Sequence, residues 1–300
     1  MMCKLILLLP FVLVACGRDQ EPKSKQQYPS PMAESTRTHV RVNEVDVSGV
    51  SLSLEGVLPV SVEVFVPRGV TPSSQTDILI HFHGVSYIPW TAVSGLDDPP
   101  ILAVVNLGSG SSVYEGPFLE ESTFSDLIRG ILRLADVTPP DSLSENSVFL
   151  SAFSAGYGAV RAILGTHLDM VSGVLLLDGL HTDYVPDRVT LSEGGRLNES
   201  KMRDFVALAE LAVQGEKKFL ITHSEIFPGT YASTTETADY LLSKVGLRKR
   251  SVLEWGPGGM QLLSRADSSG LTILGFAGNT APDHMDHLHN MYSFLKMIWE

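Results

Sequence analysis

The feature that most constrains this chain is a series of short apolar runs separated by longer stretches with helical spacing. The runs lie at 78–82, 101–107, 148–150, 174–177, 219–222 and 271–276. Helical spacing fills most of the intervals between them, at 119–136, 155–168, 197–214 and 231–246, and a last helix is expected at 287–299. Continuously apolar strands that alternate with helices are typical of a parallel sheet covered on both faces. The sequence therefore predicts an α/β fold with a mostly parallel central sheet and helices on both faces.

Two earlier segments have a different pattern. Polar and apolar residues alternate over 38–43 and again, more strictly, over 60–66. Such alternation is expected where one face of a strand meets water, as in many antiparallel pairs. We therefore predict antiparallel strands at the N-terminal side of the sheet, and we place the folded domain at 38–300.

Residues 1–16 predict export. Lys4 precedes an apolar run over 5–14, which has the length of a signal peptide and is too short to span a bilayer. The run ends in Leu-Val-Ala-Cys, which resembles the bacterial lipobox. That resemblance implies that Cys16 is lipidated and anchors the protein on the outer side of a bacterial membrane, in the periplasm or at the surface. An ordinary secretory signal is the alternative. The polar, proline-containing segment 17–37 is expected to be a flexible tether.

Charge and cysteine content exclude other classes of function. Acidic residues outnumber basic ones by 34 to 22, which gives a net charge of −12. The sequence has no basic run with interleaved aromatic residues, so nucleic acid is not expected as a partner. The two cysteines are Cys3, inside the export segment, and Cys16. A cysteine nucleophile, a disulfide and a thiolate metal site are therefore excluded from the mature chain, and no cofactor is predicted.

The strongest signal for chemistry is a serine between a strand and a helix. Positions 152–156 read Ala-Phe-Ser-Ala-Gly, so Ser154 has a small residue two positions before it and another two positions after it. A nucleophile on a tight, strained turn needs small neighbours at both places, because larger side chains would collide with the adjoining strand and helix. Ser151 fails this requirement, since Phe149 and Phe153 flank it. A serine that merely caps a helix is the alternative interpretation.

With this motif in the middle of an alternating chain, the sequence resembles the α/β-hydrolase superfamily over about residues 40–300. The resemblance implies that Ser154 is the nucleophile of an esterase-like or lipase-like serine hydrolase, with alanine in place of the first glycine of the motif. It also implies an oxyanion hole made by two backbone N–H groups. These belong to Val85, in the His-Gly turn after the strand at 78–82, and to Ala155.

The resemblance places the general base after the last strand. Three histidines lie there within six residues, His284, His287 and His289. The family commonly carries its base a few residues before the last helix, which favours His284, with His287 second. A metal-dependent hydrolase that uses this cluster is a further alternative. However, the His-Glu-x-x-His motif is absent, and a loop entering a helix cannot easily turn three histidines toward one ion.

The sequence offers two candidates for the acid that orients the histidine. The family tends to carry an aspartate after the strand at 219–222, where this chain has Ser224 and Glu225. Some lipases of the fold place the acid one strand earlier, at the position that Asp178 occupies here. We therefore predict Asp178 as the acid, with Glu225 as the second candidate.

These assignments predict a serine hydrolase that cleaves a carboxylic ester. Ser154, His284 and Asp178 would act as a triad and form an acyl-enzyme. The expected partner is a small-molecule or polymer-derived ester, and the choice of an ester over an amide follows analogy with the fold. A serine peptidase or amidase on the same fold, and a catalytically inactive surface-binding protein, are the alternatives.

Overall fold

The computed structural model describes residues 47–73, 75–137 and 147–299. Cys16, the tether at 17–37 and the strand predicted at 38–43 lie outside the described residues. Within the described ranges, none of the helices combines the length and the apolar character that a bilayer crossing requires.

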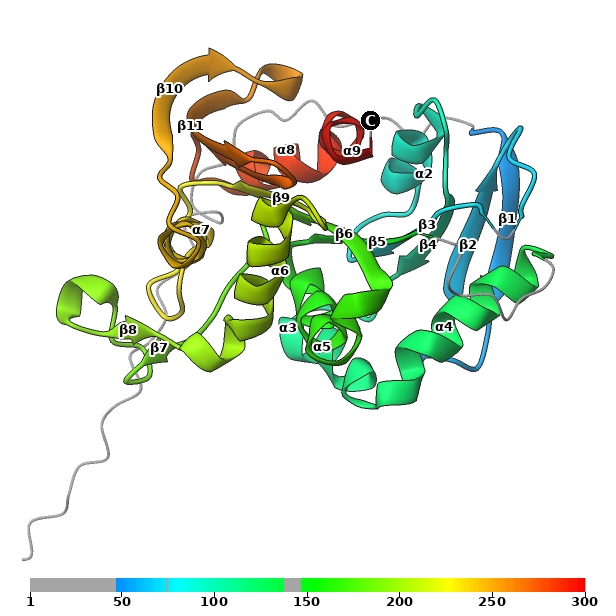
Figure 1. The fold of residues 1–300 in the computed structure, drawn as a ribbon, viewed down its shortest axis with the longest axis horizontal. Coiled ribbons are helices and arrows are strands. Elements are labelled where there is room, and N and C mark those ends of the chain that lie inside the picture. Colours follow the sequence, from blue (N-terminus) through cyan, green and yellow to red (C-terminus); the bar gives the residue numbers. More distant parts are fainter. Residues whose placement is uncertain (1–46, 74, 138–146, 300) are drawn as a thin grey trace, which may run out of the picture.

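A ten-stranded sheet runs through the described part of the chain (Figure 1). In their order across the sheet, the strands are β1 (Gly49–Leu54), β2 (Val62–Pro67), β4 (Ile101–Val105), β3 (Ile78–Phe82), β5 (Val148–Phe153), β6 (Val171–Leu177), β9 (Lys218–His223), β12 (Leu271–Phe276), β11 (Gln261–Ser268) and β10 (Arg250–Trp255). The six strands from β4 to β12 run parallel to one another. At the two ends of the sheet, β1, β2, β11 and β10 run antiparallel to their neighbours. The predicted fold class, a mostly parallel sheet with antiparallel N-terminal strands, is confirmed.

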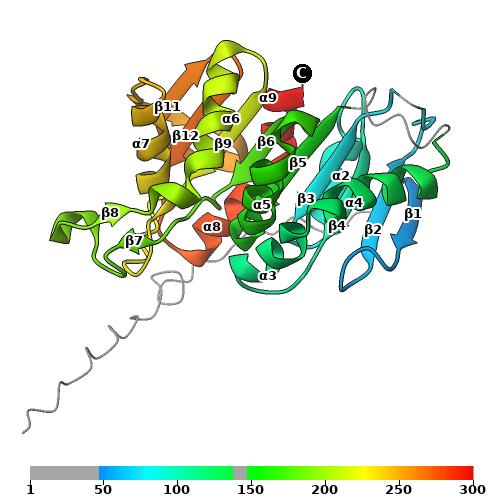
Figure 2. The same cartoon turned by 60° about the horizontal axis from the view of Figure 1, so that its bottom comes forward.

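The central strands are apolar at nearly every position because helices cover both faces of the sheet. In β3, Ile78, Ile80 and Phe82 belong to one hydrophobic core and Leu79 belongs to the other, as the two-residue period of a strand requires. The first core is covered by α4 (Glu121–Leu134), α5 (Tyr157–His167), α6 (Arg203–Gln214) and α7 (Thr234–Lys244). The second is covered by α2 (Tyr87–Ser94) and α9 (Met291–Trp299). Figures 1 and 2 show these two layers on opposite sides of the sheet.

Smaller elements complete the described chain. Two short helices, α3 (Ser111–Glu115) and α8 (Ala281–His289), follow β4 and β12. A two-stranded ribbon pairs β7 (Tyr184–Val185) with β8 (Arg196–Leu197). The remaining turns of 3₁₀ helix are η1 (Gly116–Leu119), η2 (Ser154–Gly156), η3 (Leu168–Met170), η4 (Leu191–Glu193), η5 (Glu199–Lys201) and η6 (Pro257–Gly259).

The C-terminal helix differs from its prediction. The single helix expected at 287–299 is two helices, α8 and α9, and α8 already begins at Ala281. The early start has a local cause, since the Asp283 carboxylate accepts hydrogen bonds from the backbone N–H and the hydroxyl of Thr280. His284 therefore lies on a helix, whereas the sequence placed it in a loop.

The parallel strands determine where polar side chains can gather. All six strands end at the same edge of the sheet, which we call the carboxyl edge. The residues that directly follow them include His83 after β3, Asn106 after β4, Ser154 after β5, Asp178 after β6 and Ser224 shortly after β9. Ligands of open α/β sheets bind at this edge.

Candidate active site

The turn at Ser154 is strained in the way that a nucleophile elbow requires. β5 ends at Phe153, and Ser154 then has a φ of +47°, a left-handed conformation that a non-glycine residue adopts only at a local cost of about 1–3 kcal/mol. η2 and α5 follow directly. The turn thus lifts Ser154 out of the strand direction and places Ala155 at the start of a helix, where backbone N–H groups have no partner within the helix.

Two glycines allow this turn to pack against its neighbours. A Cβ atom on Gly156 would collide with the carbonyl oxygen of Phe82 in β3. A Cβ atom on Gly179 would lie 2.7 Å from the backbone nitrogen of Ser154. The small residue two positions after the serine was predicted from the sequence. The need for a glycine at position 179 was not.

Asp178 and His284 form a hydrogen bond. His284 Nδ1 lies 2.7 Å from Asp178 Oδ2, although the two residues are 106 positions apart. Asp178 ends β6 with a φ of +42° and is buried. The ring of His284 also packs against the ring of Phe153, with 4.5 Å between the ring centres, so the imidazole lies beside the elbow. The structure therefore brings together the predicted base and the predicted acid next to the predicted nucleophile.

Three further donors hold the Asp178 carboxylate. Ser224 gives its backbone N–H to Oδ1 at 2.9 Å and its hydroxyl to Oδ2 at 2.8 Å, and Thr234 gives its hydroxyl to Oδ1 at 2.8 Å. Burial by itself raises the pKa of Asp178, but the positive charge that His287 takes up in acid and the hydrogen bond from His284 outweigh burial and hold the pKa well below its usual range. The acid is thus ionised and fixed in orientation.

The second candidates for the acid and the base make other contacts. Glu225 is exposed, and its carboxylate accepts a hydrogen bond of 3.3 Å from the backbone N–H of Gly278. His287 is buried, and its Nδ1 lies 2.8 Å from the Thr222 hydroxyl. Burial lowers the pKa of His287 to about 4, so this imidazole is neutral at physiological pH.

Ser151 has a structural partner instead of an exposed position. Its hydroxyl lies 2.8 Å from Nδ1 of His81, on the neighbouring strand, and both side chains are buried. His81 Nε2 lies 3.0 Å from the His83 carbonyl oxygen, so Nε2 carries the proton and Nδ1 accepts from Ser151. Burial lowers the pKa of His81 to about 3. This pair is buried in the sheet and is separate from the elbow.

The turn after β3 contains the first predicted oxyanion donor. His83 and Gly84 have φ values of +75° and +134°. Backbone bonds hold the turn, from His83 N–H to the Val105 carbonyl at 3.1 Å and from Gly84 N–H to the Asn106 side chain at 3.0 Å. The next N–H belongs to Val85, whose side chain is exposed.

A buried tyrosine braces the same turn. The hydroxyl of Tyr114, on α3, accepts the Leu107 N–H at 3.2 Å and lies 2.8 Å from His83 Nδ1. Because the hydroxyl already accepts from the backbone, its own proton is free to be donated to His83. Tyr114, Ser224 and Thr234 are residues of the candidate site that sequence reasoning missed.

A cavity of about 370 Å³ opens beside the elbow. Ser154 and Ala155 are among the residues that line it, and its volume lies in the range of small-molecule sites. The described residues contain no group of three or more histidine, cysteine, aspartate or glutamate side chains arranged to hold a metal ion. The histidines of α8 are thus not gathered around a common centre.

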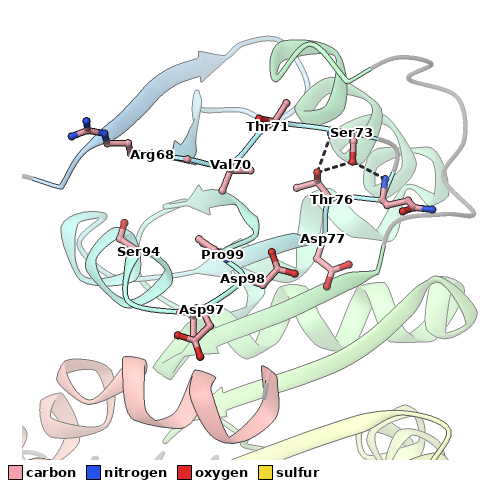
Figure 3. A pocket seen from close by; sticks show the side chains of 13 residues that line it. Arg68, Val70, Thr71, Ser73, Thr76, Asp77, Ser94, Asp97, Asp98 and Pro99 are labelled. Atoms are coloured by element: carbon pink, nitrogen blue, oxygen red, sulfur yellow. Dashed lines mark hydrogen bonds between the residues drawn. The ribbon is translucent and has the colours of Figure 1, made fainter.

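A larger cavity, of about 530 Å³, lies at the opposite edge of the sheet (Figure 3). Its walls come from the segment after β2 and from the segments that precede β3 and β4, and they carry Asp77, Asp97 and Asp98. Burial raises the pKa of Asp77, and the charge of Asp98 acts in the same direction. We place the candidate active site at the smaller cavity, because the strained serine and the Asp178–His284 pair are there.

Comparisons with known proteins give likeness in structure only. No protein-family model matches the sequence, and no curated protein matches it. Among solved structures, the chain is similar to a feruloyl esterase module from Clostridium thermocellum, at 13% identity and a TM-score of 0.49, over 86% of this chain and 96% of that one. It is also similar to an acetyl xylan esterase from Aspergillus awamori, at 12% identity and a TM-score of 0.44, over 82% of this chain and 100% of that one. A dienelactone hydrolase from Anabaena variabilis is similar at 12% identity and a TM-score of 0.39, over 84% and 98% of the two chains.

Proposed function

We propose that this protein is a serine hydrolase that cleaves carboxylic esters. Ser154 would attack the acyl carbon while His284 takes the serine proton, and the N–H groups of Val85 and Ala155 would stabilise the oxyanion. The bond to the leaving oxygen then breaks, and His284 returns the proton to that oxygen. Water, activated by the same histidine, would release the acid from Ser154. Asp178 would hold the imidazole in the tautomer with Nδ1 protonated.

The observation that carries this proposal is the meeting of three features at one edge of the sheet. These are a serine held at positive φ, a cavity that this serine lines, and a buried carboxylate bonded to a histidine beside it. A serine that only caps a helix needs neither the strain nor the aspartate–histidine pair. The four hydrogen bonds to Asp178 further support a carboxylate that is held ready to orient the imidazole.

Labelling by a fluorophosphonate tests the proposal. The purified domain should react once, and mass spectrometry should map the adduct to Ser154. Ser151 provides an internal control, because it lies three residues away in the same peptide and is buried against His81. The Ser154→Ala variant should not be labelled. If the folded protein is not labelled, the chain is not an active serine hydrolase, and the inactive binding protein becomes the better interpretation.

We also propose, from the sequence alone, that Cys16 carries lipid and anchors the enzyme to a membrane of the cell envelope. Cys16→Ser should then release the protein from membranes or block its processing, as seen by fractionation and by gel mobility. Unchanged membrane association together with unchanged mobility would contradict lipidation.

A further inference from the structure

The cavity beside Ser154 adjoins both the proposed nucleophile and one of the proposed oxyanion donors, Ala155. His284 protonates the leaving oxygen in the proposed mechanism, so the leaving alcohol has to lie near its imidazole. His284 is not among the residues that line the cavity, whereas Ser154 and Ala155 are. We therefore assign the cavity to the substituent of the acyl carbon, since the proposed nucleophile and one proposed oxyanion donor both line it.

Three rings form a continuous wall of this cavity. The imidazole of His181 meets the ring of Tyr157 nearly edge to face, with 5.6 Å between ring centres and an angle of 67°. On its other side it meets the ring of Tyr231 at 5.0 Å and 85°. All three residues line the cavity. Because each ring supports the next, the wall is a preformed surface for a flat group, for which edge-to-face and offset contacts are favourable.

The protonation of His181 is determined by its backbone contact. His181 Nδ1 lies 2.8 Å from the carbonyl oxygen of Ala232, which can only accept, so Nδ1 carries the proton. Burial lowers the pKa of His181, and the imidazole is therefore neutral. A neutral imidazole with its proton on Nδ1 has a lone pair on Nε2, so the cavity wall offers a hydrogen-bond acceptor.

The lining offers an anionic acyl group no cationic side chain of its own. Among the described residues that line the cavity, none is lysine or arginine, and Asp183 supplies a carboxylate. Asp183 forms its ion pair with Lys201 at 2.7 Å, and both side chains are partly exposed. The three rings favour a flat group over an aliphatic chain through ring–ring contacts.

We propose that this cavity is an acyl subsite for a neutral hydroxyaryl acid, in which the ring lies against the wall of Tyr157, His181 and Tyr231 and the hydroxyl donates to His181 Nε2. The inference rests on the proposed ester hydrolysis and assigns the substrate class of that same site. His181 is then a residue that determines specificity, located three positions after the catalytic acid.

Three methyl esters test the subsite. Methyl 3-(4-hydroxyphenyl)propanoate, methyl 3-phenylpropanoate and methyl hexanoate share a saturated carbon next to the carbonyl, so the ring hydroxyl does not change the intrinsic reactivity. The wild-type kcat/KM should fall in that order. The ring hydroxyl should raise kcat/KM roughly tenfold, as expected for one net hydrogen bond. His181→Phe keeps a ring but removes the acceptor, so it should abolish the preference for the hydroxyl. Tyr231→Leu should reduce the preference for a ring over an alkyl chain by several-fold.

A matched control variant tests whether these effects are specific to the residues that line the cavity. Phe227→Leu changes an aromatic residue of the same segment that is 48% exposed and does not line the cavity, and it should leave all three rates unchanged. Tyr231 is 36% exposed, so its variant supplies the test if His181→Phe does not fold. A preference for hexanoate, or a hydroxyl preference that survives in folded His181→Phe, overturns the subsite while ester hydrolysis stands. Failure of the wild type on all three esters, together with absence of fluorophosphonate labelling, overturns the proposed function as well.

Discussion

Two cavities of the described residues, the one beside Ser154 and the larger one in Figure 3, lie at opposite edges of one sheet and differ in more than size. The larger one, at the starts of β3 and β4, carries three aspartates, and among its described lining residues only Gly69 has a positive φ. The smaller one is lined by Ser154, a non-glycine residue with a positive φ, and two more such residues, His83 and Asp178, follow the neighbouring strands β3 and β6. Backbone strain costs stability and persists only where the surrounding structure imposes it. In this molecule strain, and not volume, distinguishes the candidate site.

The largest expected effect comes from removing the proposed nucleophile or the proposed base at the strained edge. Ser154→Ala and His284→Ala should each lower the turnover of a short-chain activated ester by roughly 10³-fold or more, because the two groups act as one unit. For the same reason, the double variant should be only slightly worse than either single one. Rates should be measured on variants with unchanged circular dichroism. Full activity in Ser154→Ala would show that the edge with the strained residues is not the active site.

Substitution of the acid should have the next largest effect. Asp178→Asn should lower turnover by roughly 10²-fold, less than Ser154→Ala, because it spoils the tautomer and the orientation of His284 but leaves the nucleophile. Glu225→Gln and His287→Gln should retain most of the activity, since their contacts are with Gly278 and Thr222. Kinetics on the three variants decide the assignment. A severe loss in Glu225→Gln with a mild loss in Asp178→Asn would reverse it.

The two edges should also respond differently to acid. The folded pKa of His287 is about 4, below its usual 6.5, so between these values the unfolded chain takes up a proton that the folded chain does not. The free energy of unfolding should therefore fall as the pH falls from 6.5 toward 4, by up to about 1.4 kcal/mol per pH unit for this group. His81 acts in the same direction. The raised pKa of Asp77, at the opposite edge, acts with the opposite sign at lower pH, because the folded chain then binds the proton first.

Urea denaturation at several pH values between 4.5 and 7.5 measures this dependence. His287→Gln removes one titrating group and should flatten the slope by about one proton. An unchanged slope in that variant would show that His287 binds its proton equally well in the folded and the unfolded chain, which would contradict the lowered pKa.

The smallest expected effect concerns the larger cavity. Asp98→Asn should change kcat/KM for esters by less than about twofold, because the lining of that cavity contains no part of the proposed triad. The matched measurement is Asp178→Asn on the same substrates. A loss of more than tenfold in Asp98→Asn would mean that the two edges act together and that the comparison fails.

Much of the fold could be predicted because the pattern is local. Strands such as β3 and β12 are continuous apolar runs, and their predicted and observed bounds coincide. Small residues at fixed spacing around Ser154 likewise predicted the tight turn at this serine. The edge hairpin of β10 and β11 was missed, because β10 is largely exposed, β11 is only partly buried, and neither strand is a continuous apolar run. The early start of α8 was missed although Thr280 and Asp283 have the spacing of a capping pair.

The support of Asp178 could not be predicted, because it comes from residues far away in the sequence. Ser224 is 46 positions away and Thr234 is 56 positions away, and only the sheet order brings β6 and β9 together. The hydroxyl of Tyr114 likewise contacts the imidazole of a residue, His83, that lies 31 positions away in the sequence. No pattern of composition or spacing distinguishes these hydroxyls from ordinary surface or core residues. The assignment of Asp178 over Glu225 was therefore made by resemblance and not by spacing.

The contact between Ser224 and Asp178 has a consequence for how such a catalytic site can change over evolutionary time. Ser224 touches both oxygens of the carboxylate, so the side chains that end two neighbouring strands occupy adjacent space. A lineage that acquired aspartate at position 224 would hold two carboxylates there, and mutual repulsion would raise the pKa of one of them. In that doubled state one carboxylate stays ionised and the other is protonated, beside the same imidazole of His284. The position of the acid could then change from one strand to the next through an intermediate sequence that always contains at least one aspartate.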